Sequence, residues 1–189
     1  MTATSSDRPG DWLAGERAEL AAGRILDVAE ELFIADGVNA VTMRQVAEAV
    51  GCSRATLYRY FPSREVLQLA YIDRAAQQVV RHVSDAVGET VGEERTLRAI
   101  TAALAGVRAN PALLAWFTPD AAGTSTDLAL ISPAVEKVVA DFLGAPSNTP
   151  VTHLRAQWLV RVIVSLLTSP GESLFVEEEL LRTFVLPVL

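Results

Sequence analysis

Apolar residues recur at three- and four-residue steps along most of the chain, a spacing typical of amphipathic helices rather than strands. The first helix is expected over about residues 16–35. It stops at Gly37, because glycine readily adopts the left-handed conformation that ends a helix. A second helix begins at Thr42, which forms a capping-box pattern with Gln45, and continues to about residue 50.

Turn residues then separate two further helices. Gly51 breaks the second helix, and Ser53 is placed to cap a third helix that ends at Phe61. Pro62 cannot continue that helix, so a long fourth helix is expected over residues 64–87.

The rest of the chain continues as helices separated by proline- and glycine-containing loops. Five further segments are expected at about residues 93–109, 111–117, 127–143, 151–168 and 176–188. Pro133 either kinks or splits the third of these, and loops are expected at 119–126 and 144–150. The pattern predicts an all-α protein of about nine helices. A three-helix N-terminal domain (1–62, with a disordered tail at about 1–12) is expected to precede a larger helical domain (63–189).

Composition narrows the class of protein. Half of the 189 residues are hydrophobic, so the chain can bury a core. Its one cysteine, Cys52, excludes an internal disulfide and is most simply a small buried residue. No apolar run resembles a signal peptide, and the most apolar stretch, 158–167, is too short to span a bilayer. We therefore expect a soluble, cytoplasmic protein that does not bind membranes.

Charge points to one region of the chain. The net charge is −7, which argues against general coating of nucleic acid by positive charge. Between residues 42 and 64, however, four arginines face a single acidic residue, Glu48. This surplus is consistent with a confined DNA-binding surface, and equally with a solvated helical face that has an excess of arginine.

The segment 42–61 decides between these interpretations. Two short helices joined by a tight turn at Gly51 are typical of a helix-turn-helix, which places its second helix in the major groove of DNA. The first turn of that helix offers Ser53, Arg54 and Thr56 to base edges, where an arginine can bind guanine through two hydrogen bonds. Capping alone would also explain Ser53.

Residues 20–70 resemble the TetR family of bacterial one-component transcriptional regulators. The resemblance rests on Phe33-Ile-Ala-Asp-Gly37, on Thr42-Met-Arg-Gln-Val-Ala and on Thr56-Leu-Tyr-Arg-Tyr-Phe61 followed by Ser63-Arg-Glu. It implies DNA contacts at Thr42, Arg44, Arg54, Thr56, Tyr58, Tyr60 and Arg64, with a less defined role for Arg59. Of these, Arg54 and Thr56 would read bases, while Thr42, Tyr58, Tyr60 and Arg64 would bind phosphates. Thr42 has a capping role as an alternative and the two tyrosines a core role, and Phe61 is expected in the core.

The last two helices carry more apolar surface than one domain needs, which predicts a partner subunit. The expected dimer stripe consists of Leu154, Trp158, Val162, Ser165, Leu181, Phe184 and Val188. In the resembling family these helices form a four-helix bundle with their copies. A monomer that buries both helices in its own core is the alternative.

The middle helices are expected to enclose a pocket for a small-molecule effector, as the resemblance implies. The predicted lining is Leu104, Arg108, Leu113, Trp116, Phe117, Ile131 and His153. The candidate polar anchors are Arg108, Asn110, His153 and Arg155. Each apolar member of this set could equally belong to an ordinary core.

The sequence therefore predicts a homodimeric regulator that binds double-stranded DNA at a palindromic operator. The expected behaviour is repression relieved by a lipophilic effector. The alternatives are a regulator without a ligand and a helical adaptor that binds proteins. Catalysis is not expected, because the two histidines lie on separate segments and no Gly-rich phosphate loop is present. No Cys/His/carboxylate cluster has metal-ligand spacing, so we expect no metal and no cofactor.

Overall fold

The computed structural model describes residues 11–118, 120–143 and 149–189, and every regular element there is helical. The α-helices are α1 Asp11–Asp36, α2 Met43–Val50, α3 Arg54–Tyr60, α4 Arg64–Val87, α5 Gly92–Arg108, α6 Pro111–Leu114, α7 Ala122–Ile131, α8 Pro133–Leu143, α9 Pro150–Thr168 and α10 Leu174–Leu180. A π-helical turn (Leu181–Val185) and a 3-10 turn (Leu186–Val188) continue α10. The predicted all-α fold is confirmed.

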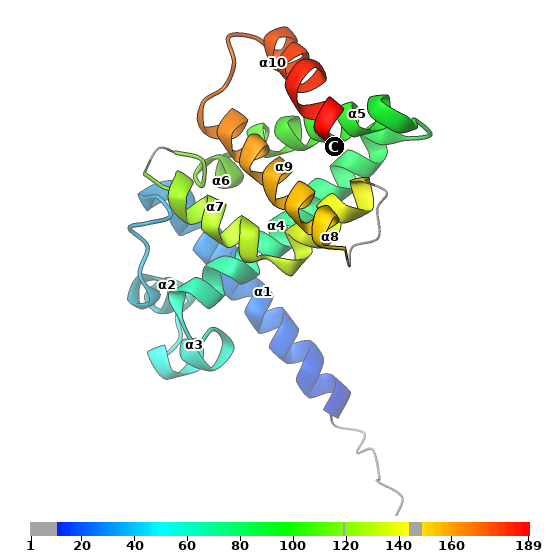
Figure 1. Ribbon diagram of the computed structural model, residues 1–189. Helices are drawn as coiled ribbons and strands as arrows, with labels where there is room; N and C mark the ends of the chain where they lie inside the picture. The colour runs from blue at the N-terminus through cyan, green and yellow to red at the C-terminus, as the bar shows by residue number, and fades with distance from the viewer. Residues whose placement is uncertain (1–10, 119, 144–148) are drawn as a thin grey trace, which may run out of the picture.

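The short helices α2 and α3 lie at one end of the molecule, and α10 lies at the opposite end (Figure 1). The long helix α4 leads away from α3 and packs along α5 and α8. Helix α9 in turn packs on α7 and α8. Helix α4 contacts α1 as well as α5 and α8. It therefore links the α1–α3 region to the helices from α5 onward.

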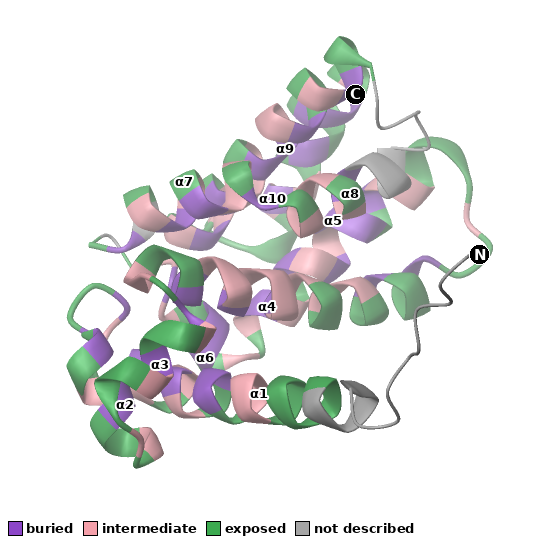
Figure 2. Cartoon of the chain, turned by 90° about the horizontal axis from the view of Figure 1, so that it is seen from below, coloured by how far each residue is buried: buried purple, intermediate pink, exposed green. Residues whose placement is uncertain are grey.

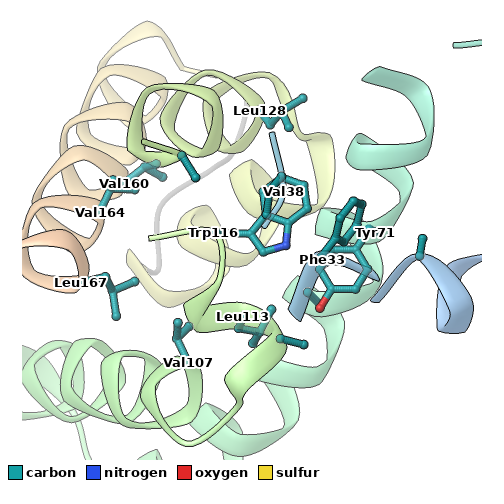
Figure 3. Packing of buried hydrophobic residues seen from close by; sticks show 14 of the residues in the cluster. Phe33, Val38, Tyr71, Val107, Leu113, Trp116, Leu128, Val160, Val164 and Leu167 are labelled. Atoms are coloured by element: carbon teal, nitrogen blue, oxygen red, sulfur yellow. The ribbon is translucent and has the colours of Figure 1, made fainter. Parts of the chain in front are cut away.

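Three aromatic side chains join the two parts of the core. Phe33 of α1, Tyr71 of α4 and Trp116, which follows α6, are each at most 2% exposed. The ring centroids of Phe33 and Trp116 are 5.2 Å apart in an edge-to-face arrangement, and those of Tyr71 and Trp116 are 5.5 Å apart and stacked. Figure 3 shows Trp116 between Tyr71 and Phe33 on one side and the α9 residues Val160 and Val164 on the other. The core is therefore continuous across the predicted domain boundary at residue 62.

Helix boundaries differ from the predicted ones mainly around α1, α6 and α7. Helix α1 begins at Asp11, so residues 11 and 12 of the expected tail are helical, whereas 1–10 lie outside the described residues. Helix α6 ends at Leu114 rather than at 117. Helix α7 begins at Ala122, so the second half of the expected loop 119–126 is helical.

Proline accounts for the break between α7 and α8. Ser132 has φ −75° and ψ 116°, an extended conformation, because the ring of the following proline disfavours α geometry at the preceding residue. Pro133 therefore splits the segment rather than kinking it. The expected loop at 144–150 falls largely outside the described residues. None of the described helices is long and apolar enough to cross a membrane.

Candidate functional site

Side-chain caps define the start of α2. The Thr42 Oγ1 accepts a hydrogen bond from the Gln45 backbone N–H at 3.3 Å. In return the Gln45 Oε1 accepts from the Thr42 backbone N–H at 2.9 Å, and also from the Thr42 hydroxyl at 2.7 Å. The predicted capping box is confirmed, so the Thr42 side chain already has a structural role.

The turn between α2 and α3 has the geometry of a helix-turn-helix. Gly51 has φ 77° and ψ 34°, the left-handed conformation that ends α2 at little steric cost for glycine. Ser53 then caps α3, with its Oγ accepting from the Thr56 backbone N–H at 3.1 Å. Val46 of α2 and Leu57 of α3 are fully buried, and the two helices are in contact with each other.

The outer surface of α3 carries the predicted base-reading residues. Ser53, Arg54, Tyr58 and Arg59 are exposed, as the exposed segments of α2 and α3 in Figure 2 illustrate. Arg54 makes no hydrogen bond or ion pair with any residue that the structure describes, so its guanidinium is available to a ligand. Thr56 is half-buried, and its hydroxyl lies 2.9 Å from that of Ser53.

The remaining predicted DNA contacts differ in environment. Arg44 is well exposed and lies 3.7 Å from Glu48 in an ion pair within α2. Tyr60 is half-buried against the core, with the guanidinium of Arg59 5.4 Å from its ring centroid. Phe61 is 5% exposed, which confirms its predicted place in the core.

Arg64 has a role that the sequence did not indicate. Its Nη2 donates to the backbone carbonyls of Val38 at 2.9 Å and of Asn39 at 2.8 Å. These bonds tie the first turn of α4 to the loop between α1 and α2. The predicted phosphate contact is untested, but the guanidinium already holds two carbonyl partners.

About three turns after Arg64, a second set of polar contacts joins α4 to α1. Arg74 donates to Asp27 Oδ1 at 2.6 Å and to Glu30 Oε2 at 2.7 Å. Its neighbour Asp73 accepts a hydrogen bond from Ser132, at the junction of α7 and α8, at 2.5 Å. Two adjacent residues of α4 therefore contact different parts of the chain: Arg74 contacts α1, and Asp73 contacts the junction of α7 and α8.

An apolar pocket of about 150 Å³ lies among α4, α5, α7, α8, α9 and the segment around Trp116. Three residues of the predicted lining are found there: Leu113, Trp116 and Phe117. The other walls include Ile72 of α4 and Val160 and Val164 of α9, the last two labelled in Figure 3. The prediction that the middle helices leave a pocket is thus consistent with the structure, although its predicted lining is only partly right.

Four predicted lining residues lie elsewhere. Ile131 is 64% exposed at the end of α7. His153 is hydrogen-bonded through Nδ1 to Glu136 at 2.9 Å, and it lines a much smaller cavity. Leu104 and Arg108 line an open groove of about 570 Å³ on the other side of α5, towards α10.

Arg108 lies outside the apolar pocket because its side chain pairs with Glu177. Its guanidinium forms two 2.7 Å hydrogen bonds with the carboxylate of Glu177 and a 3.0 Å bond with the carbonyl of Leu166. Glu177 also accepts from the Gly171 N–H at 2.8 Å. The hydrogen bonds from Arg108 hold the pKa of Glu177 below its usual range, so the carboxylate stays charged although it is nearly buried.

The predicted dimer stripe is mostly accessible in the single chain. Leu154, Phe184 and Val188 are 63%, 67% and 57% exposed, while Trp158 and Val162 are half-buried and Ser165 is exposed. Leu181 was wrongly included, because it is fully buried within its own chain. Leu181 shares its buried face with Val185, and the π-helical turn has more residues per turn than the α-helical spacing that grouped Leu181 with Phe184.

The sequence did not single out several other exposed apolar side chains on the same helices. They are Val151 on α9 and Leu174 and Phe175 on α10. The apolar character of both helices indicates that such side chains are present. It does not indicate which of them are exposed in the folded chain. Within the described ranges, no group of three or more His, Cys, Asp and Glu side chains could hold a metal ion.

Comparisons with known proteins agree with this architecture. The family model "Bacterial regulatory proteins, tetR family" matches residues 25–71, which include α2, α3 and the start of α4. An HTH-type transcriptional regulator of Mycobacterium tuberculosis is 41% identical over 182 residues, covering 95% of this chain and 90% of that protein. The HTH-type transcriptional regulator AlkX of the same organism is 28% identical over 162 residues, covering 79% and 75%.

Solved structures show the same fold. A TetR-family transcriptional regulator from Streptomyces coelicolor matches with a TM-score of 0.64 at 20% identity, covering 89% of this chain and 99% of that one. The TetR-family repressor AlkX from Dietzia sp., implicated in biodegradation of n-alkanes, matches with a TM-score of 0.51 at 22% identity, covering 88% and 93%. Both likenesses extend well beyond the helix-turn-helix.

Proposed function

The chain belongs to the TetR family of bacterial regulatory proteins, and from this premise we propose that it is a homodimeric repressor, released from a palindromic operator by a small lipophilic effector. Its relatives are HTH-type transcriptional regulators, a class distinct from enzymes. The observation that carries the proposal is Arg54 at the first turn of the capped helix α3, which is exposed and has no partner among the described residues.

The environment of Arg54 supports recognition of a base. A guanidinium can bind guanine O6 and N7 together, and such a bidentate contact discriminates against a wrong base by about 1–3 kcal/mol. We assign phosphate contacts beside it to Tyr58 and Arg59, which are exposed one turn further along α3. Phosphate contacts set position and affinity, while Arg54 would contribute sequence preference.

Dimerisation supplies the second recognition helix. A helix-turn-helix dimer binds two half-sites about 34–36 Å apart, which requires a fixed distance between its α3 helices. The exposed apolar residues of α9 and α10, among them Leu154, Phe184 and Val188, support these helices as the dimer surface. In Figure 1 α10 lies at the end of the molecule opposite α3, and α9 lies in the middle, beside α8.

Coupling between effector and DNA would run through α4. Ile72 and Ala75 line the apolar pocket, while Arg64 and Arg74 tie the first turns of the same helix to α1 and to the α1–α2 loop. We therefore place residues 64–74 of α4 with the DNA-binding part. A ligand that moves the pocket wall of α4 would change the distance between the two α3 helices and so reduce affinity for the operator.

A lipophilic effector is supported by the pocket itself and, more weakly, by the relatives. The pocket lining is almost entirely hydrocarbon. The structurally similar AlkX repressor is implicated in biodegradation of n-alkanes, which makes apolar compounds reasonable first candidates. The absence of an effector response would favour the constitutive alternative.

The test begins with selection of genomic fragments that the purified full-length protein binds. Binding to one fragment is then measured by fluorescence anisotropy at several salt concentrations, beside scrambled DNA. We expect a salt slope of roughly −0.9 per phosphate contacted. Arg54→Ala should lose most of the preference for the selected fragment, about 10- to 100-fold, whereas Tyr58→Phe should weaken binding to both DNAs alike.

Arg81→Ala is the matched control, because Arg81 is an exposed arginine of α4 far along the chain from α3. It removes the same charge and should leave the preference unchanged. Equal binding of wild type and Arg54→Ala to the selected fragment would show that α3 does not read bases through this residue. Failure to select any fragment would support the adaptor alternative.

A further inference from the structure

The apolar pocket has no ionisable side chain in its lining. Apart from Trp116 and Ser125, every lining side chain is hydrocarbon. The Ser125 hydroxyl is already bound to the carbonyls of Trp116 and Ala121. The indole N–H of Trp116 is the one polar lining atom found buried without a partner among the described residues. Figure 3 shows this nitrogen on the side of Trp116 that is next to Phe33 and Tyr71, away from Val160 and Val164, so the described lining offers a ligand no charged group.

Charged residues adjacent to the lining are directed elsewhere. Arg108 follows Val107 of the pocket, but its guanidinium binds Glu177 beyond α5. Glu136 follows Val135 of the pocket and is bound to His153. These two pairs contain Arg108 and His153, two of the four polar anchors expected from the sequence, and none of the four lines this pocket.

We propose that this pocket binds an uncharged, hydrocarbon-rich molecule and discriminates against its carboxylate counterpart. A buried carboxylate without a cation or several hydrogen bonds is strongly disfavoured, whereas apolar surface gains free energy on leaving water. An apolar cavity of about 150 Å³ in another protein stays dry and binds benzene, so a six-carbon ring is a suitable probe. The inference names the ligand class of the proposed effector site and depends on the proposed function only for its effect on DNA.

The experiment compares cyclohexane with cyclohexanecarboxylate at pH 7, at equal free concentrations, on the full-length protein. Binding is followed by the thermal unfolding midpoint and by NMR signals of valine and leucine methyl groups. We expect cyclohexane to raise the midpoint and to shift methyl signals of Val160, Val164 and Leu167. Binding of the carboxylate should be weaker by at least about 100-fold.

A matched pair of variants locates the site. Val164→Thr keeps the shape of a lining side chain but adds a hydroxyl, and it should weaken cyclohexane binding severalfold. Val83→Thr makes the same change at a buried position of α4 outside the pocket, in a separate apolar cluster. It should reduce stability without changing the affinity for cyclohexane. Equal effects of the two variants on that affinity would overturn the assignment of the site.

The outcomes separate this inference from the proposed function. Tighter binding of the carboxylate, or no binding of cyclohexane, would overturn the ligand class while leaving DNA recognition intact. If cyclohexane binds in the pocket but does not weaken the complex with selected DNA, the ligand class is supported and release by an effector is not. Loss of DNA binding on addition of cyclohexane, absent in Val164→Thr, would support both.

Discussion

The helix-turn-helix and the C-terminal helices are stabilised by contacts of different range. In α3 the capping hydrogen bond joins Ser53 to Thr56, three residues away. In the C-terminal helices the Arg108–Glu177 ion pair joins residues 69 positions apart, and Trp116 packs on aromatic rings of α1 and α4. The DNA-reading surface is thus shaped locally, whereas the pocket and the packing of α10 depend on the whole fold.

This difference fits the tasks of the two regions. A capped two-helix unit can hold Arg54 outward with few buried partners, so its surface can change while its shape stays the same. The pocket has its walls on helices that are distant in sequence, and a displaced wall moves several contacts together. Substitutions in the second region should therefore cost more stability than substitutions in the first.

The largest effect is expected for Trp116→Ala. Removing a fully buried tryptophan leaves a cavity and two broken aromatic contacts, so the free energy of unfolding should fall by about 3–5 kcal/mol. Tyr58→Ala, on the 39% exposed surface of α3, should change it by no more than about 0.5 kcal/mol. Chemical denaturation at one fixed protein concentration measures both. A similar loss of unfolding free energy in both variants would contradict the expected difference in stability between the two regions.

Glu177→Gln should have the next largest effect. It keeps the size of the side chain but leaves Arg108 without its counter-charge. The free energy of unfolding should fall by about 1.5–3 kcal/mol, the range for hydrogen bonds to charged groups. Glu178→Gln is the control, since Glu178 pairs with Arg182 at the surface and should contribute no more than about 1 kcal/mol. A larger loss for the control would show that α10 is not held by the buried pair.

The same pair predicts a dependence on pH. Hydrogen bonds from Arg108 lower the pKa of Glu177, so the unfolded chain binds its proton more tightly than the folded one. The stabilisation is therefore complete above a pH of about 4.5, the ordinary value for glutamate, and is lost as the pH falls through the lowered pKa. The stability difference between wild type and Glu177→Gln should shrink over that interval. A difference that stays constant down to pH 3 would argue against this ion pair as its source.

The helix-turn-helix, which is stabilised by local contacts, is also the region that the sequence predicts well. Thr42, Gln45, Gly51 and Ser53 lie within a few residues of their partners, and each has the capping or turn role expected of it. The buried position of Phe61 follows equally from its place after the short helix. Such features depend on backbone geometry, which a sequence pattern encodes directly.

The C-terminal helices, which are held by contacts between residues distant in sequence, could be predicted only in outline. Nothing near Arg108 in the sequence indicates Glu177 as its partner, so the arginine was expected to anchor a ligand. Ile131 and Leu181 are both apolar members of helices, yet one is exposed and the other buried. Helical periodicity gives the faces of a helix but not which face its neighbours cover, and the π-helical turn at Leu181 shifts that periodicity within the last helix.

Apart from the control variants, the smallest effect on stability is expected at Ser53, where two variants distinguish a capping role from a DNA contact. Ser53→Ala removes the cap of α3 and should lower the free energy of unfolding by about 1 kcal/mol. Ser53→Asn keeps an acceptor for the Thr56 N–H and should stay close to wild type in stability. Both variants lack the hydroxyl that faces solvent beside Arg54.

Binding to the selected DNA fragment then assigns the hydroxyl. If Ser53 acts only as a cap, Asn should retain full affinity and Ala should lose affinity only through fraying of the first turn of α3. If the hydroxyl itself contacts DNA, Asn should bind as weakly as Ala despite its intact stability. We expect the first result, because the Ser53 Oγ lies within hydrogen-bonding distance of both the Thr56 N–H and the Thr56 hydroxyl. That leaves base recognition at this turn to Arg54, whose guanidinium has no partner within the described chain.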